Sequence, residues 1–491
     1  MSNSIKLSVL IAAIALAGCT VGPNFARPEA PASNGYAATG DAVRPIAGGP
    51  HATLGEGAGP RWWQAFGSAQ LDALVDKAIA NNNSLAASNA TLERAREQIR
   101  AVAGKRLPQI DANARIEREQ VNLQAFGFDS SAFPGISTKN PVFNLYSVGG
   151  GVSYDLDLFG RNRRKLEQAV AIAEAQQRQT EAAHLTIAGR VVEQVLIIAT
   201  YRARIAVAEA LLAEDQKLVD LTDKRRIAGE GTLTEVTNVQ AQLAADRDDI
   251  PQLRQPIDEA RHMLATLTGV APDALGPTDF DIATFTLPAD VPVAIPATLV
   301  RKRPDILQAE ADLHASTAAI GVATAELYPN ISIGATLTYA AGTPGGLFSN
   351  DLKGFDIFGG LTAPIFHGGT LKAQQRMAVD DAKAKAATYR QTILEAFQQV
   401  ADLLSALQTD QRALVNHQDS VAIAGRSRNL SRRSFQVGNS GILTVLDSER
   451  LYQRAQLGLV DARAKQFLNV ARLYVATAGG WTGPAVIAAT P

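Results

Sequence analysis

The feature that most constrains this 491-residue chain is an internal repeat. The segment Gly151–Leu156 matches Gly360–Ile365 at an offset of 209 residues, and the register continues for more than a hundred residues. Beyond a glycine-rich turn the offset becomes 210, so that Leu233 falls on Leu443. A register held this long indicates two copies of one supersecondary unit. The expected repeats are residues 61–280 and 281–491.

Each repeat opens with two strand-like segments. Between residues 331 and 339, apolar side chains alternate with Ser, Gly and Thr, which is the period of a strand with one apolar face. A half-buried soluble sheet and a membrane barrel with a wet interior both fit this alternation. The expected strands are about 108–122 and 142–158 in the first repeat and about 329–341 and 355–366 in the second.

A long helical hairpin follows the strands in each repeat. Apolar residues recur every seven positions from Val191 to Val219 and again from Ile393 to Val421, which is a coiled-coil seam. Each first helix would approach about 95 Å at 1.5 Å per residue. Pro251 and Pro256 should bend or break one returning helix. The expected hairpins are about 163–270 and 369–480, with equatorial helices before the first, a helix at about 304–325 before the second, and a C-terminal tail after it.

The strands constrain the assembly. The smallest membrane barrels have about eight strands, and open strand edges are not tolerated in lipid. Four strands per chain therefore cannot close a barrel alone. If these strands enter a membrane, several copies must share one barrel, and their long helices must continue it as a tube. This reasoning does not give the number of chains.

The N-terminus has the pattern of an export signal. Lys6 precedes an apolar run from Leu7 to Ala17, which is too short to span a bilayer. The residues Leu16–Cys19 resemble a bacterial lipobox, in which the cysteine thiol receives a diacylglycerol. An ordinary secretory signal with an incidental cysteine is the alternative. We expect a signal peptide over 1–18 and a lipidated tether over 19–60.

Composition excludes several classes of function. Cys19 is the only cysteine, so the exported chain has no disulfide framework. The net charge of −1 offers no basic footprint for nucleic acid. The six histidines are scattered without metal-ligand spacing, and no nucleophile elbow or phosphate-binding loop is present. We therefore expect no enzyme activity, no metal and no cofactor other than lipid on Cys19.

Three motifs resemble those of a known family. They are Arg303-Pro304-Asp305-Ile306, Asp157-Leu158-Phe159-Gly160-Arg161 and Pro364-Ile365-Phe366-His367-Gly368-Gly369. With the lipobox and the duplication, they are similar to the outer membrane factor family (TolC/OprM-like) and to its NodT-type efflux lipoproteins. This resemblance implies a mainly α protein with membrane strands. Three chains would form a twelve-stranded β-barrel that continues into a periplasmic α-barrel.

The resemblance also implies a function and partners. The homotrimer would be the exit duct of an efflux pump in the Gram-negative outer membrane, lipid-anchored and with a large periplasmic portion. Its partners would be a periplasmic adaptor and an inner-membrane pump of the resistance-nodulation-division type, and its cargo small molecules such as drugs. Two alternatives stay open: the outer-membrane component of type I protein secretion, and a coiled-coil envelope lipoprotein without a pore.

By the same resemblance, functional residues lie at the ends of the hairpins. Separately, by similarity to bacterial lipoproteins, Thr20 rather than Asp after the cysteine favours sorting to the outer membrane. The turns would receive the adaptor, and acidic residues beyond them would form rings at a pore constriction. The docking residues are Gly229, Gly231, Gly438 and Gly441, and the constriction residues are Asp447, Glu235, Phe435, Thr444 and Arg463.

Overall fold

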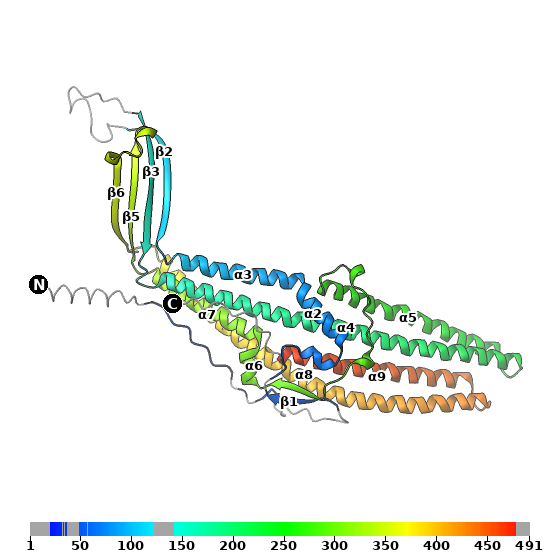
Figure 1. The fold of residues 1–491 in the computed structure, drawn as a ribbon. Helices are drawn as coiled ribbons and strands as arrows, with labels where there is room; N and C mark the ends of the chain where they lie inside the picture. Colours follow the sequence, from blue (N-terminus) through cyan, green and yellow to red (C-terminus); the bar gives the residue numbers. More distant parts are fainter. Residues whose placement is uncertain are drawn as a thin grey trace, which may run out of the picture.

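A computed structural model gives the fold (Figure 1). It describes residues 20–31, 33, 35–36, 49–55, 57–121 and 142–477, so Cys19 and the C-terminal tail lie outside the described residues. A sheet stands at one end of the molecule, and long helices run away from it to the other end (Figure 1).

The sheet contains strands from both repeats. All neighbours in it are antiparallel, and the order is β2-β3-β5-β6, so the two strand pairs lie side by side. In the central pairing Gly151 lies opposite Thr336, which joins the first repeat to the second. The strands are β2 (Gln109–Gln120), β3 (Val142–Asp155), β5 (Asn330–Ala341) and β6 (Lys353–Thr362). β6 stops before Pro364, because proline cannot donate a ladder hydrogen bond.

One surface of this sheet is apolar and uncovered. On the outer strand β6, Phe355, Ile357 and Leu361 lie on the same face and are all exposed. On the opposite outer strand, Ile110 and Ile116 are exposed as well. Within the described residues, this exposed apolar surface lies next to two strand edges without a partner, which indicates a sheet that is completed by other molecules or by lipid.

The long helices reproduce the duplication in their lengths. Helices α4 (Arg161–Ile227) and α8 (Thr370–Gln436) each have 67 residues, or about 100 Å at 1.5 Å per residue. The helices that return from their ends, α5 (Leu233–Leu267) and α9 (Ile442–Thr477), have 35 and 36 residues. α4 packs on α5 and α8 on α9, so each repeat forms one helical hairpin.

Helix α5 runs through both of its prolines. The sequence predicted a bend or a break, and the break is wrong. A proline at position i frees the carbonyl at i−4. Here those carbonyls belong to Arg247 and Gln252, whose residues are exposed. Water can satisfy them, so the helix continues past Pro251 and Pro256.

The strand-to-helix junction of the first repeat explains one of the sequence motifs. Asp157, with a left-handed φ of 46°, accepts hydrogen bonds from the backbone N–H of Asn162 at 2.9 Å and of Arg163 at 3.0 Å. It thereby satisfies free donors at the start of α4. Arg161 forms an ion pair of 2.9 Å with Asp155 at the end of β3. The motif thus fixes the angle between strand and helix.

The main core lies around the middle of the helices. Val191 and Ile198 of α4 and Val400 and Leu407 of α8 are fully buried there. Trp62, in a short helical turn, packs on Tyr474 of α9. The smaller elements outside the sheet and the two long hairpins are β1 (His51–Gly55), η1 (Trp62–Phe66), α2 (Ala69–Asn81), α3 (Asn83–Gly104), η3 (Pro272–Ala274), η4 (Ile282–Thr284), β4 (Asp290–Ala294), α6 (Pro296–Lys302) and α7 (Pro304–Ala325). Two further short turns, η5 (Pro344–Gly346) and η6 (Asn350–Leu352), lie between β5 and β6.

The segment expected to be a tether is attached to the body at several points. β1 pairs in parallel with β4, with His51 opposite Asp290. Tyr36 donates a hydrogen bond to the carbonyl of Ala294 at 2.5 Å. Over its described residues this segment is therefore docked on the helical body and is not a free linker.

Within the described residues, no helix combines the length and hydrophobicity needed to cross a bilayer.

Candidate docking tips and gate

The turn between α4 and α5 has a defined backbone geometry. Gly229 follows the last helical turn with a left-handed φ of 79°. The N–H of Glu230 donates to the carbonyl of Arg225 at 2.9 Å, and the N–H of Gly229 donates to the carbonyl of Arg226 at 3.0 Å. This is a Schellman motif, which requires a residue that tolerates positive φ. The glycine is therefore set by the turn itself.

The turn between α8 and α9 repeats this geometry. Gly438 has a φ of 80°. The N–H of Asn439 donates to the carbonyl of Ser434 at 2.8 Å, and the N–H of Gly438 donates to the carbonyl of Phe435 at 3.1 Å. A Cβ added at Gly438 or at Gly441 would meet no atom within 4 Å, as at Gly229. At Gly231 it would lie 3.1 Å from the carboxylate of Glu235. Three of the four predicted docking glycines thus border open space.

Each turn is flanked by two exposed aliphatic side chains. In the first hairpin Ile227 is 70% exposed and Leu233 is 66% exposed. In the second, Val437 is 70% exposed and Leu443 is 63% exposed, at positions offset by 210 residues. Sequence reasoning had not assigned these residues a role. Their signal was large apolar side chains at equivalent positions of both repeats, beside glycines. Each tip presents a small apolar surface that no residue in the described part of the chain covers.

A small separate core stabilises the two tips against each other. Phe435 of α8 is only 3% exposed and packs among residues of the other three long helices, namely Leu218, Val239, Ile442, Val445 and Leu446. The guanidinium of Arg225 lies 4.5 Å from its ring centroid and donates to its carbonyl at 2.9 Å. In this arrangement the ring of Phe435 faces the interior of its own chain.

Glu235 has a local structural task. Its carboxylate accepts the N–H of Thr232 at 2.9 Å, and its own N–H donates to the hydroxyl of Thr232 at 3.2 Å. This reciprocal pair is a capping box at the start of α5. The negative charge also lies at the positive end of the helix dipole.

The other predicted constriction residues lie on α9. Thr444 and Asp447, one helical turn apart, are both exposed, and Asp447 is 4.0 Å from Arg450. Arg463 is exposed too, but it lies about 24 Å further along the helix at 1.5 Å per residue. Among the described residues it forms no ion pair with Asp447 or Glu235. The structure thus brings Thr444 and Asp447 together and leaves Arg463 apart.

A partly buried ion-pair network lies behind the tips, and sequence reasoning missed it. Arg432 of α8 contacts Glu214 of α4 at 2.5 Å and also bonds to Glu449 of α9. Hydrogen bonds from Lys217 and Arg432 lower the pKa of Glu214 to about 2. Burial raises the pKa of Glu449, which is 3% exposed, against the opposing effect of Arg432. One guanidinium thereby links the two hairpins.

Two carboxyl groups meet beside this network. Asp215 of α4 is 1% exposed, and Asp246 of α5 is 9% exposed. Burial, followed by a hydrogen bond to Asp246 and the charges of Asp246 and Glu449, raises the pKa of Asp215 to about 7. Within the described residues no donor faces its Oδ2 atom. The pair is stable when Asp215 carries a proton and shares it with Asp246.

No group of three or more His, Cys, Asp and Glu side chains suited to a metal ion occurs in the part of the chain that the structure describes.

Both repeats match one protein family. The sequence profile described as "Outer membrane efflux protein" covers residues 74–270 and 295–479. The chain belongs to the outer membrane efflux protein family. This confirms the resemblance drawn from the sequence motifs, and it makes the long hairpins and the sheet parts of an outer-membrane efflux channel.

Curated relatives of this efflux protein align over most of their length. The pyoverdine export outer membrane protein OpmQ of Pseudomonas aeruginosa is 28% identical, with 86% of this chain and 87% of that protein covered. The probable efflux pump outer membrane protein TtgC of Pseudomonas putida is 28% identical, with 97% and 95% covered. Nodulation protein T of Rhizobium leguminosarum bv. viciae is 27% identical, with 99% and 95% covered.

Solved structures agree with the fold. The outer-membrane channel OprN superposes with a TM-score of 0.83 at 27% identity, covering 94% of this chain and all of that one. The open state of the Neisseria gonorrhoeae MtrE outer membrane channel gives a TM-score of 0.78 at 26% identity, covering 94% and 98%. The predicted fold class, mainly α with membrane strands in duplicated units, is confirmed.

Proposed function

We propose that this efflux protein is the passive exit duct of a tripartite pump and that it works as a homotrimer. The observation that carries the proposal is the sheet, which in the described part of the chain has two edges without a partner and an exposed apolar face. Three copies of its four strands would close a twelve-stranded barrel and remove every edge. The hairpins of the same copies would continue below it as a tube.

The helices support the same assembly. The heptad residues of α4 are fully buried near its middle, at Val191 and Ile198, but only half-buried toward the tip, at Ile205, Leu212 and Val219. A coiled-coil seam that one chain covers only in part is suited to further helices. Neighbouring copies would supply them.

The tips would receive a periplasmic adaptor that connects the duct to an inner-membrane pump of the resistance-nodulation-division type. Apolar side chains flank an unobstructed glycine turn in each hairpin, so a helical hairpin of the adaptor could approach the backbone closely. Gly229, Gly231, Gly438 and Gly441 set the shape of this surface. Ile227, Leu233, Val437 and Leu443 supply its apolar area.

Asp447 and Thr444 would face the narrowest part of the duct. Three exposed copies of Asp447 form a ring of negative charge that favours cations. Glu235 and Phe435 would act on this constriction indirectly, by capping α5 and by filling the tip core. Arg463 would lie further up the tube, where it could meet an acid of a neighbouring copy.

Export and anchoring complete the proposal. Cys19 would carry the lipid of the mature protein, which would be held in the Gram-negative outer membrane with its helices in the periplasm. Relatives are named for the export of pyoverdine and the efflux of antibiotics and toluene, so we expect small organic molecules as cargo. The duct itself would bring no catalysis and no cofactor.

Conductance in planar bilayers tests the proposal. We expect purified wild-type protein to give small, cation-preferring events, and Asp447→Ala to give larger and less selective ones. Asp273→Ala, which removes an exposed acid of the equatorial belt, is the matched control. If assembled trimers conduct nothing in either form, the protein is a coiled-coil spacer and not a duct.

A second experiment separates efflux from type I protein secretion. Deletion of the gene should sensitise cells to small toxic compounds and leave the set of proteins in the medium unchanged. The reverse result would assign the duct to a protein exporter.

A further inference from the structure

A cavity of about 610 Å³ lies between the two helical hairpins, next to the ion-pair network of Arg432 and on its side toward the sheet. Helices α4 and α8 both pack on α9, and side chains of all three helices line the cavity (Figure 1). Pockets that hold small organic molecules have volumes of roughly 300–1,000 Å³. The cavity is therefore large enough for such a molecule.

Arg428 of α8 gives this cavity a cation whose donors are only partly used. Its Nε atom is enclosed and has no hydrogen-bond partner among the described residues. Its Nη2 donates to Oδ1 of the adjacent Asn429 at 3.4 Å, which is a long contact. Glu449 is close enough for an electrostatic interaction with Arg428, but its hydrogen bond goes to Arg432. A guanidinium has five N–H donors and prefers a carboxylate acceptor, so Arg428 is suited to an anion from outside the chain.

The guanidinium is held in a defined position by an aromatic ring. It lies 4.0 Å from the ring centroid of Tyr452 on α9. The hydroxyl of Tyr452 accepts a hydrogen bond from Gln456. A Cβ added at Gly425 of α8 would lie 3.3 Å from the same ring, so the glycine allows the ring to lie against α8. The cation is thus positioned before any ligand arrives, which favours binding.

The wall on α4 has a different chemistry. Its side chains are short and apolar, and they include Ala206, Val207 and Ala210. Ala206 and Ala210 are separated by one helical turn, lie on the same face and are both exposed. A flat apolar group can lie against such a row of small side chains, while a carboxylate attached to it reaches Arg428.

We propose that this cavity is a binding site for a small organic anion, namely a carboxylate on a flat apolar body, and that Arg428 binds the carboxylate. The ligand contacts α8 through the arginine and α4 through the alanine wall. It therefore adds a link between the two hairpins beside the existing contact of Arg432 with Glu214. Neither the tips nor the proposed constriction contributes a residue to this site.

The cavity and the proposed constriction lie on opposite sides of α9. Gln456 follows Asp447 by nine residues, which is about two and a half turns at 3.6 residues per turn. A ligand in the cavity therefore does not block the pore. By binding where the hairpins are close together, it shifts the duct toward its closed state. This effect on gating rests on the proposed duct, whereas binding does not.

Protection of an introduced cysteine from alkylation tests the site. Cys19 is the only cysteine of the natural chain, so the peptide mass identifies a thiol placed in the cavity wall by Ala210→Cys. The probe is 1-naphthoate, and its uncharged counterpart is 1-naphthamide. We expect 1-naphthoate to slow alkylation of the purified, assembled protein by N-ethylmaleimide in a saturable manner. The concentration needed should be about tenfold lower, or less, than that of 1-naphthamide, because a charge-assisted hydrogen bond is formed.

Variants of the arginine test its role in the same background. Arg428→Ala should weaken protection by 1-naphthoate about tenfold or more and leave protection by 1-naphthamide unchanged. Arg428→Lys keeps the charge but loses the planar guanidinium, so its effect should be intermediate. Arg426→Ala, which changes an exposed arginine two positions away, is the matched control. If Arg428→Ala weakens protection by both ligands equally, the arginine only maintains the packing and does not bind the carboxylate.

Three further results would overturn the site. They are no protection by 1-naphthoate up to its solubility, equal protection by the acid and the amide in the wild-type background, and a thiol at position 210 that fails to react without ligand. The last result would mean that a neighbouring subunit fills the cavity. In planar bilayers, 1-naphthoate should reduce the open events of the wild type but not those of Arg428→Ala. Unchanged events with intact protection would overturn the effect on gating alone, and a wild type without conductance would overturn the duct while protection still decides the site.

Discussion

Arg432 of α8 donates a hydrogen bond of 2.5 Å to Glu214 of α4, and this contact joins the two helical hairpins of the chain behind their tips. The same guanidinium also binds Glu449 of α9, which is almost fully buried. Any movement of one hairpin away from the other must therefore separate the half-buried guanidinium of Arg432 from a carboxylate.

Removing this arginine should loosen the tips. Arg432→Ala leaves Glu449 buried without its main partner, which costs about 3–5 kcal/mol in comparable sites. We expect a lower melting temperature and longer or larger open events in planar bilayers. Arg433→Ala, which changes the exposed neighbour, should behave as the wild type does in both measurements. An unchanged channel in Arg432→Ala would show that the hairpins are held by other contacts.

Stability near the tips should depend on pH through Asp215. Its folded-state pKa of about 7 lies above the ordinary value of 3.8, so the folded protein keeps a proton that the unfolded chain releases. The resulting stability is fully present below about pH 4 and is lost as the pH rises to about 7. Asp215→Asn should remove this slope and raise stability above pH 7 by about 1–3 kcal/mol. Melting temperatures from pH 4 to pH 8 provide the check.

Glu214 should contribute the opposite slope. Its pKa is lowered to about 2, so its ion pairs stabilise the protein above the ordinary value of 4.5 and are lost as the pH falls toward 2. Glu214→Gln should flatten the acid side of the melting curve and leave the response between pH 5 and pH 7 in place. A loss of the response in that upper window would mean that Asp215 and Glu214 titrate as one unit.

The two roles considered for Glu235 can be separated by two substitutions. Glu235→Ala removes the capping box and should destabilise α5 by about 0.5–2 kcal/mol. Glu235→Gln keeps the cap, because glutamine serves in the same motif, but removes the charge. We expect the Glu235→Gln variant to retain the wild-type melting temperature. If Gln nevertheless lowers cation selectivity in bilayers, the carboxylate acts in the pore as well as in the cap.

The apolar tips should be needed for the pump but not for the pore. Leu443→Asp places a charge on the proposed adaptor surface and should weaken adaptor binding about 10- to 100-fold, the cost of losing one buried leucine. Single-channel conductance should stay the same. Leu430→Asp, at an exposed leucine of α8 away from the turn, is the control. Equal adaptor affinity in both variants would place the docking surface elsewhere.

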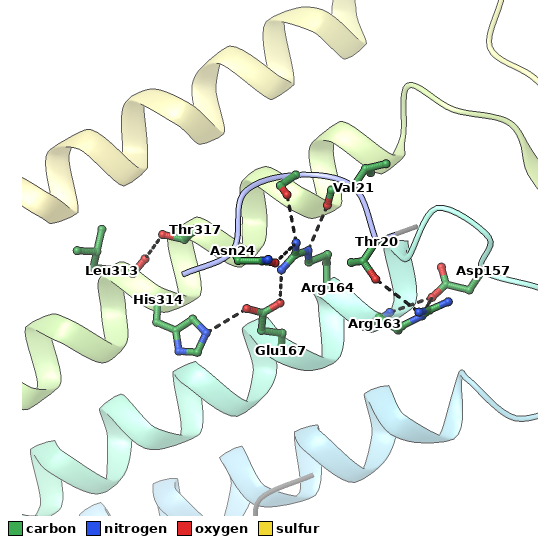
Figure 2. Close-up of polar contacts among 11 residues, drawn as sticks. Thr20, Val21, Asn24, Asp157, Arg163, Arg164, Glu167, Leu313, His314 and Thr317 are labelled. Carbon is green, nitrogen blue, oxygen red and sulfur yellow. Dashed lines mark hydrogen bonds and ion pairs between the residues drawn. The ribbon is translucent and has the colours of Figure 1, made fainter. Parts of the chain in front are cut away.

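How much the sequence predicts depends on the range of the interactions. The long helices could be predicted because a heptad pattern is local, and α7 was placed at about 304–325 against Pro304–Ala325 in the structure. The family motifs could be read in the same way. The pairing of β1 with β4, the contact of Arg164 with Asn24 (Figure 2) and the network around Arg432 join residues far apart in sequence and leave no periodic signal.

Single positions were harder than elements. Phe435 and Asp447 both followed the family pattern for a constriction, yet the structure buries the first and exposes the second. The difference arises where four helices converge around Leu218 and Val239, which no pattern within one helix predicts. Glu235, in contrast, lies three residues after Thr232, and that spacing already contains the signature of a cap.

The equal lengths of α4 and α8 limit which insertions and deletions the two helices can accept. Both run 67 residues from the sheet to a turn of the same geometry, so the two hairpins end level with each other. In the proposed trimer, six tips would then form a flat rim against which an adaptor could seal. Deleting a heptad from α4 alone would shorten three of the six and open a leak. A change in the length of the duct therefore has to occur in both repeats at once, and in whole heptads on the outgoing and the returning helix.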